Sequence, residues 1–143
     1  MPKVGAILRL PALIAAAMSL ALAACVSPHR SSCKPGEQSA VQDTLYFGTN
    51  WASGSVTAHE WAKFLELSVT PRFPKGFTVS NASGQWRGTD GTIVQESTYV
   101  LSVIHPDGAP SEAAIAEIVA SYKSAFQQES VLRSRMLEGV TLR

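Results

Sequence analysis

Three side chains in this sequence are well placed for chemistry: a cysteine near the start, and an arginine and a glutamate near the middle. Cys25 ends the run Leu22-Ala23-Ala24-Cys25, in which small residues precede a thiol. Such a run is typical of a lipobox, where a peptidase cuts before the cysteine and the thiol carries a diacylglycerol thioether. We therefore expect lipidation at Cys25 and attachment to a membrane through that lipid.

The segment before this cysteine has the pattern of a secretory signal. Lys3 and Arg9 give it a positive start, and the apolar run that follows is interrupted by Pro11 and Ser19. The run is shorter than the roughly 20 apolar residues that a membrane-spanning helix needs. We interpret residues 1–24 as a lipoprotein signal peptide and residues 25–42 as a flexible tether with few apolar residues.

Ordinary signal cleavage after an A-x-A pattern at residues 21–23 is the alternative. It would release a soluble protein in which Cys25 and Cys33 could pair in an oxidising compartment. If Cys25 is lipidated instead, Cys33 has no partner in its own chain. Val26 follows Cys25, where some Gram-negative lipoproteins carry the Asp that retains them at the inner membrane, so an exported, periplasm-facing protein of the outer membrane is favoured.

The charge balance argues against nucleic-acid binding. Removing residues 1–24 takes away two of the 12 basic residues and leaves 10 basic against 11 acidic ones. A near-neutral chain lacks the basic stripe that nucleic-acid binding requires. The cysteines and histidines have no metal-like spacing, so we expect neither a metal site nor a cofactor.

Residues 43–143 are expected to form one folded domain. Periodicity and turn residues predict strands at 43–50, 76–80, 92–104 and 130–135, a helix over 57–69 that begins with a Thr57–Glu60 capping box, and a second helix from Ser111. This order predicts a ferredoxin-like β-α-β-β-α-β fold of the α+β class. Its two helices would cover one face of a four-stranded antiparallel sheet and leave the other face open.

The stretch GQWRGTDG, residues 84–91, predicts the direction of the side chains around this open face. Asp90-Gly91 is typical of a two-residue type I′ hairpin turn. That turn would put Gln85 opposite Glu96 and Trp86 opposite Gln95. Trp86 would then point to the helices, and Gln85, Arg87, Glu96 and Thr98 would form a candidate binding site on the open face.

Two roles are open for the charged pair in this site. Arg87 and Glu96 would be diagonal neighbours, and as an exposed ion pair they would contribute less than about 1 kcal/mol. They could instead bind a polar or anionic ligand or anchor a partner. In an enzyme of dimeric α/β-barrel type, Arg87 would stabilise a developing negative charge, and Glu96, its pKa raised by burial, would act as a general base.

Other residues are assigned to scaffold or surface. We expect Phe73, between Pro71 and Pro74, to plug the core and Trp61 to lie within it. Trp51 is expected to be an exposed contact residue. The three histidines, His29, His59 and His105, are expected on the surface.

From Asp43 to about Arg135 the chain resembles the bacterial DUF3574 family. The resemblance rests on LYFG, on Trp61 and Phe64, on TPRFPKGFTV, on GQWRG with Glu96 downstream, and on QESVLR. It implies an exported location and a shared fold, and it brings no activity or catalytic residues. We expect a non-catalytic binding or self-association module, with a homodimer as one possible assembly and no known ligand, and a small enzyme or ligand-binding protein as the alternative.

Overall fold

A computed structural model describes residues 33–51, 54–87 and 90–141, which belong to one compact unit, Ser31–Arg143. The predicted signal peptide, Cys25 and His29 lie outside the described residues. The elements are β1 (Gln38–Gly48), β2 (Asn50–Trp51), β3 (Gly54–Ser55), α1 (Ala58–Phe64), η1 (Leu65–Val69), β4 (Thr78–Arg87), β5 (Ile93–His105), α2 (Ala109–Phe126) and β6 (Leu132–Val140).

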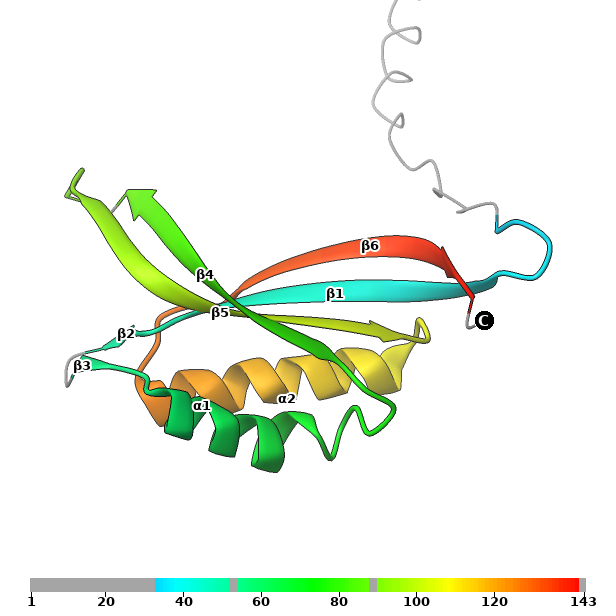
Figure 1. Ribbon diagram of the computed structural model, residues 1–143, viewed down its shortest axis with the longest axis horizontal. Coiled ribbons are helices and arrows are strands. Elements are labelled where there is room, and N and C mark those ends of the chain that lie inside the picture. Colours follow the sequence, from blue (N-terminus) through cyan, green and yellow to red (C-terminus); the bar gives the residue numbers. More distant parts are fainter. Residues whose placement is uncertain (1–32, 52–53, 88–89, 142–143) are drawn as a thin grey trace, which may run out of the picture. The chain divides into compact units, whose positions relative to one another are not determined.

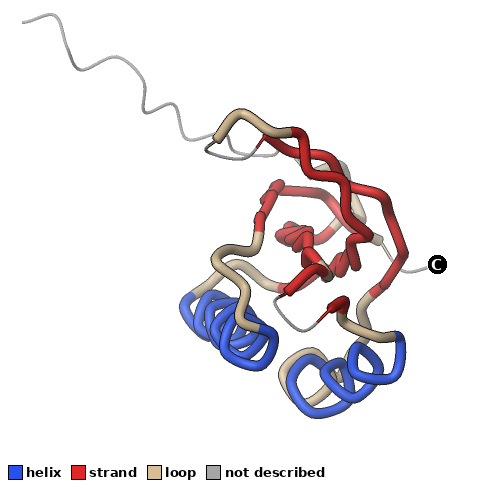
Figure 2. Tube along the Cα trace, turned by 90° about the vertical axis from the view of Figure 1, so that its left-hand side faces the viewer, coloured by secondary structure: helices blue, strands red, loops and turns tan. Residues whose placement is uncertain are grey.

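The four long strands form one antiparallel sheet in the order β4-β5-β1-β6. Both helices lie on the same side of this sheet, and no described helix covers the other side (Figures 1 and 2). The predicted α+β class and the predicted ferredoxin-like arrangement are therefore confirmed. No helix among the described residues is both long and apolar enough to cross a membrane.

The first helix begins at the predicted capping box. The backbone N–H of Glu60 donates to Thr57 Oγ1 at 3.2 Å, and the backbone N–H of Thr57 donates to Glu60 Oε2 at 2.8 Å. These bonds satisfy backbone donors that have no partner within the helix. After Phe64 the chain continues as the π-helical turn η1, and Pro71 follows shortly after its end.

The core between helices and sheet is rich in aromatic rings. Phe47 of β1 lies among Trp61, Phe64 and Tyr122, and the ring of Trp61 stacks on Tyr99 with centroids 4.6 Å apart. The buried position expected for Trp61 is confirmed. Phe73 is also buried, as predicted, and its ring contacts His105.

Two strands extend beyond their predicted bounds. β1 begins at Gln38, so residues 38–42 belong to the sheet and not to a tether, and Ala40 and Val41 are buried. β6 runs to Val140, beyond the predicted end at residue 135. Each strand pairs with the other from Gln38↔Val140 to Tyr46↔Leu132. Backbone hydrogen bonding between distant segments therefore extends both strands, although their sequences show little apolar alternation there.

The second helix begins two residues before the predicted Ser111. Gly108 is its N-cap, and Pro110 lies in the first turn, where a missing N–H costs no hydrogen bond. The Ser111 hydroxyl donates to the carbonyl oxygen of Pro106 instead.

A cluster of charged side chains around the buried Asp43 and His105 lies between the sheet and the start of α2. Asp43 Oδ2 is 2.8 Å from His105 Nε2, and Arg133 donates to both carboxylate oxygens of Asp43 at 2.7 Å. Arg133 also pairs with Glu112, which in turn pairs with Arg135. The prediction of a surface His105 is wrong, because strand alternation directs its ring towards the helices and into this cluster.

Burial by itself raises the pKa of Asp43. The hydrogen bonds and charges of Arg133 and His105 act in the opposite direction and are together stronger, so the pKa of Asp43 lies below its ordinary value. The carboxylate is therefore ionised and ties β1 to β5 and β6. This cluster is part of the scaffold behind the open face.

Candidate functional site on the open sheet face

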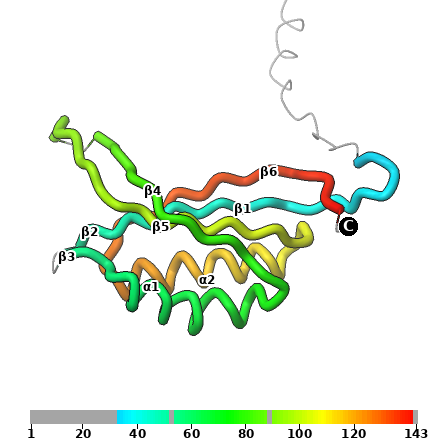
Figure 3. Tube along the Cα trace, in the orientation of Figure 1, coloured from blue at the N-terminus to red at the C-terminus, as the bar shows by residue number. Residues whose placement is uncertain are grey.

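The open face is formed by the even-numbered positions of all four long strands. On β1 and β5 these include Thr44, Tyr46, Gly48, Glu96, Thr98 and Val100, and on β4 and β6 they include Ala82, Gly84, Trp86, Leu132 and Met136. The odd-numbered positions of the two central strands, such as Leu45 and Leu101, are buried against the helices. The tube trace in Figure 3 shows the helices on that side only.

The hairpin between β4 and β5 has a different register from the predicted one. Trp86 pairs with Val94 and Gly84 pairs with Glu96, one residue away from the expected alignment. Oδ1 of Asp90 accepts hydrogen bonds from the backbone N–H and the hydroxyl of Thr92, at 3.0 and 2.7 Å. Asp90 and Thr92 therefore form a local turn, and the shift of one residue in the strand pairing reverses the faces of β4.

This shift separates the predicted site residues. Glu96 and Thr98 lie on the open face, as expected. Gln85 and Arg87 point to the other side, where Gln85 Oε1 accepts a hydrogen bond from Gln95 Nε2 at 3.0 Å. The predicted Arg87–Glu96 neighbourhood is therefore wrong. Trp86, expected in the core, lies on the open face with 51% of its surface exposed.

Glu96 lies over a glycine of the neighbouring strand. A Cβ at Gly48 would be 2.8 Å from Glu96 Oε1, so a larger residue there would displace this carboxylate from its present position. The backbone N–H of Asn50 donates to Glu96 Oε2 at 3.3 Å. The carboxylate therefore lies low on the sheet, across the end of β1.

Thr98 makes a similar contact on the other side. A Cβ at Gly84 would be 2.8 Å from Thr98 Oγ1, and Thr98 pairs with Gly48 on β1 and Ala82 on β4. Gly48, Gly84 and Ala82 together form a floor of small residues around Glu96 and Thr98. The glycine positions could have been identified from the sequence only with the correct register.

An apolar strip adjoins this floor. Tyr46 pairs with Val100 on one side and with Leu132 on the other, while Ile104 and Met136 flank Gln42. Tyr46 is 37% exposed, and Ile104, Leu132 and Met136 are each about half exposed or more. Apolar groups that remain exposed next to one another are typical of interaction surfaces.

The charges on this face are of one sign. Among the described even-numbered positions of the four strands, Glu96 and Glu138 are the only charged residues, and none is basic. The basic residues of β6, Arg133 and Arg135, lie on the helix side. The described part of this face is therefore anionic. Since Arg87 points to the other side of the sheet, no described basic side chain on this face could bind an anionic ligand.

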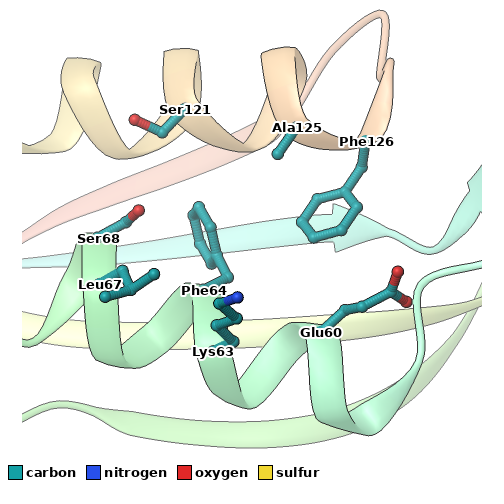
Figure 4. A pocket seen from close by; sticks show the side chains of 8 residues that line it. All are labelled: Glu60, Lys63, Phe64, Leu67, Ser68, Ser121, Ala125 and Phe126. Carbon is teal, nitrogen blue, oxygen red and sulfur yellow. The ribbon is translucent and has the colours of Figure 1, made fainter.

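The described part of the chain has one hollow away from this site and one that borders it. A cleft of about 390 Å³ separates α1 and η1 from α2, with Phe64, Leu67 and Phe126 along it (Figure 4). None of the predicted site residues lines it, and its carboxylate, Glu60, is held in the capping box. A hollow of about 250 Å³ lies beside the β2–β3 hairpin and includes Thr98. No group of three or more potential metal ligands occurs in the described ranges.

The tryptophan expected to be an exposed contact, Trp51, is half-buried. Its ring packs edge-on against Phe126, with centroids 6.2 Å apart. His59 is exposed, as expected.

Comparisons with known proteins identify a family and a fold. The sequence profile described as "Protein of unknown function (DUF3574)" matches residues 42–141. A search of curated proteins found no match. A phage SAM lyase in complex with S-methyl-5′-thioadenosine is similar with a TM-score of 0.55 and 13% identity, covering 79% of this chain and 95% of the phage chain. The apo state of a phage SAM lyase gives a TM-score of 0.50 with 15% identity, covering 75% and 91%. At these identities the likeness shows a shared fold.

Proposed function

The chain belongs to the DUF3574 family, which carries no assigned activity, and we propose that this member is a lipid-anchored cell-envelope protein whose open sheet face binds a second copy of the chain. The observation that supports this proposal is the apolar strip of Tyr46, Ile104, Leu132 and Met136, on a face that no helix of the described residues covers. Symmetric dimers are the commonest homo-oligomers and use one self-complementary patch.

The position of the two carboxylates fits this interface. Glu96 and Glu138 lie at opposite ends of the face. The strand pairings place the residues of the apolar strip between these two carboxylates along β1. The centre of the face is therefore free of charge, as the buried centres of protein interfaces usually are. Burying the exposed parts of these apolar side chains supplies the favourable free energy of association.

Light scattering on the purified unit from Ser31 to Arg143 tests self-association. We expect a dimer that dissociates in Tyr46→Glu, because a charge would be placed in the middle of the strip. Leu67→Glu is the matched control, since Leu67 is 61% exposed but lies on η1, on the helix side. A monomeric wild-type unit at about 100 μM, where even a weak specific dimer assembles, would reject the dimer.

The anchor is supported by the lipobox that ends at Cys25. Labelled palmitate should enter the full-length protein in bacteria, and Cys25→Ser should abolish labelling while Cys33→Ser should not. Separation of the membranes by density then tests the preference for the outer membrane. Labelling that persists in Cys25→Ser would reject this lipidation site.

A small-ligand site or enzyme on the same face is the second candidate. Glu96 supports it, since the carboxylate lies over small residues on the open face. The similar fold of a phage enzyme that was solved with S-methyl-5′-thioadenosine makes that molecule the first ligand to test. A rise in melting temperature with this ligand that is lost in Glu96→Gln would support the site, and the absence of any rise would count against this ligand.

A further inference from the structure

We propose that the cleft between the two helices binds an aliphatic carboxylate, a free fatty acid, with the alkyl chain between the helices and the head group on Lys63. The cleft is lined by residues of α1, η1 and α2. These elements lie on the side of the sheet opposite the open face (Figure 1). This site is therefore separate from both functions proposed above.

The cleft has the size and the lining of a small-molecule site. Its volume of about 390 Å³ lies within the range of roughly 300–1,000 Å³ that is usual for such sites. Phe64 and Phe126 are 6% and 7% exposed, and their rings lie between the helices in Figure 4. Leu67, also in the lining, is 61% exposed. A bound alkyl chain would remove this apolar surface from water, which is favourable.

An ion pair joins the two helical layers just beyond one end of the cleft. Arg72 Nη2 lies 2.8 Å from Glu117 Oε2, and Arg72 Nη1 donates to the carbonyl oxygen of Ser68 at 2.7 Å. Ser68 and Ser121 line the cleft, and Glu117 precedes Ser121 by about one turn of α2. The charge of Arg72 is therefore already compensated at this end.

The cleft itself contains one acidic and one basic side chain, and only the acidic one is held by a neighbour. Glu60 accepts hydrogen bonds from the backbone N–H and the hydroxyl of Thr57, at 2.8 and 2.7 Å, and these bonds lower the pKa of Glu60. Lys63 is exposed and has no ion pair or hydrogen bond with another described residue. Its side chain lies beside Phe64 in Figure 4. An anionic head group would give Lys63 the partner that Arg72 already has.

The shape of the cleft specifies the rest of the ligand. On α1 and η1 the lining runs from Glu60 to Ser68, roughly 12 Å of helix. An elongated, mostly apolar cleft fits a straight alkyl chain better than a compact polar ring. One ammonium group compensates one negative charge, which is the charge of a carboxylate head group. Charge and shape together therefore select an aliphatic carboxylate.

Decanoate and decylammonium form a matched pair of probes, because their alkyl chains are of similar length and their charges are opposite. The compact unit from Ser31 to Arg143 contains all the described strands and helices and the core, so each probe is titrated into this unit by calorimetry, below its micelle concentration. We expect saturable binding of decanoate and binding at least about tenfold weaker for decylammonium. Lys63→Gln should remove this preference. Lys75→Gln should retain it, since Lys75 is also exposed but does not line the cleft.

Ala125→Trp provides a second test without a change of charge. Ala125 is exposed and lines the cleft, so an indole there would occupy the space of the alkyl chain without removing a core residue. Decanoate affinity should fall at least about tenfold while the circular dichroism spectrum is unchanged. Tyr46→Glu should bind decanoate as the wild type does, even where it no longer dimerises, because Tyr46 lies on the open face.

Three results would overturn the inference. The first is no binding of decanoate, or equal or tighter binding of decylammonium. The second is an unchanged preference for decanoate in Lys63→Gln. The third is an unchanged decanoate affinity in Ala125→Trp. Each of them concerns the helix side alone, so the dimer and the ligand site proposed for the open face would stand or fall by their own tests.

Discussion

His105 Nε2 and Asp43 Oδ2 lie 2.8 Å apart in the interior of the protein, on side chains that are 3% and 0% exposed. Asp43 also receives two hydrogen bonds from Arg133, so one carboxylate connects three strands that are distant in sequence. The contact places a charge cluster directly behind the sheet whose other face we propose as the functional surface.

Replacing the central carboxylate should destabilise the fold strongly. In Asp43→Asn the partly buried Arg133 keeps Glu112 as a partner but loses the fully buried carboxylate, and His105 loses its carboxylate hydrogen-bond partner. Removing one partner of a buried ion pair costs about 3–5 kcal/mol. We expect a loss in the free energy of unfolding of about that size, measured by urea denaturation. Glu117→Gln is the control, because the Arg72–Glu117 pair is exposed and contributes less than about 1 kcal/mol. Similar losses in both variants would contradict the structural role assigned to Asp43.

The lowered pKa of Asp43 predicts how stability responds to acid. A carboxyl group whose pKa is depressed on folding stabilises the protein above its unfolded pKa, about 3.9, and loses that contribution as the pH falls through the folded value. The free energy of unfolding should therefore fall steeply below about pH 4. Asp43→Asn should show a shallower fall when urea midpoints are measured from pH 6 to pH 2. An unchanged slope in the variant would mean that other carboxyl groups dominate acid unfolding.

Two tryptophans should differ sharply in their contribution to stability. Trp61 is 6% exposed and stacks on Tyr99, so Trp61→Ala should cost about 3–5 kcal/mol by leaving a cavity. Trp86 is 51% exposed on the open face, so Trp86→Ala should cost less than about 1 kcal/mol. Chemical denaturation of both variants tests the β4–β5 register directly. A large loss in Trp86→Ala would support the predicted two-residue turn and not the register found.

Tyr122 holds the backbone beneath Glu96 from the helix side. Its hydroxyl donates to the carbonyl oxygen of Gly48 at 2.9 Å, and Tyr122→Phe should cost about 1 kcal/mol. Burial raises the pKa of Tyr122, and the charges of Tyr99 and Glu96 raise it further. The protonated Tyr122 hydroxyl therefore stabilises the folded state fully below the unfolded pKa of about 10. This contribution to the free energy of unfolding is lost as the pH rises above that value towards the raised pKa of the folded state. Tyrosine absorbance during an alkaline titration should lose its last step in Tyr122→Phe, and a titration curve with the same last step would contradict this assignment.

The sequence by itself determined the elements whose signals are local. The spacing of Thr57 and Glu60 predicted the start of the first helix, because each group of a capping box bonds within one turn. The order of strands and helices predicted the fold, since two helices with one apolar stripe each can cover only one face of the sheet. Phe73 and Trp61 were placed in the core correctly on the same local grounds.

The tertiary structure alone decided which side chains meet. The register of β4 and β5 depends on how Asp90 folds its turn, and one residue of shift moved Trp86 to the open face and Gln85 and Arg87 away from it. Glu96 meets Gly48, and Asp43 meets His105, across more than 40 residues of chain. Sequence spacing carries no information about such pairs, because strand pairing across the sheet sets their distance.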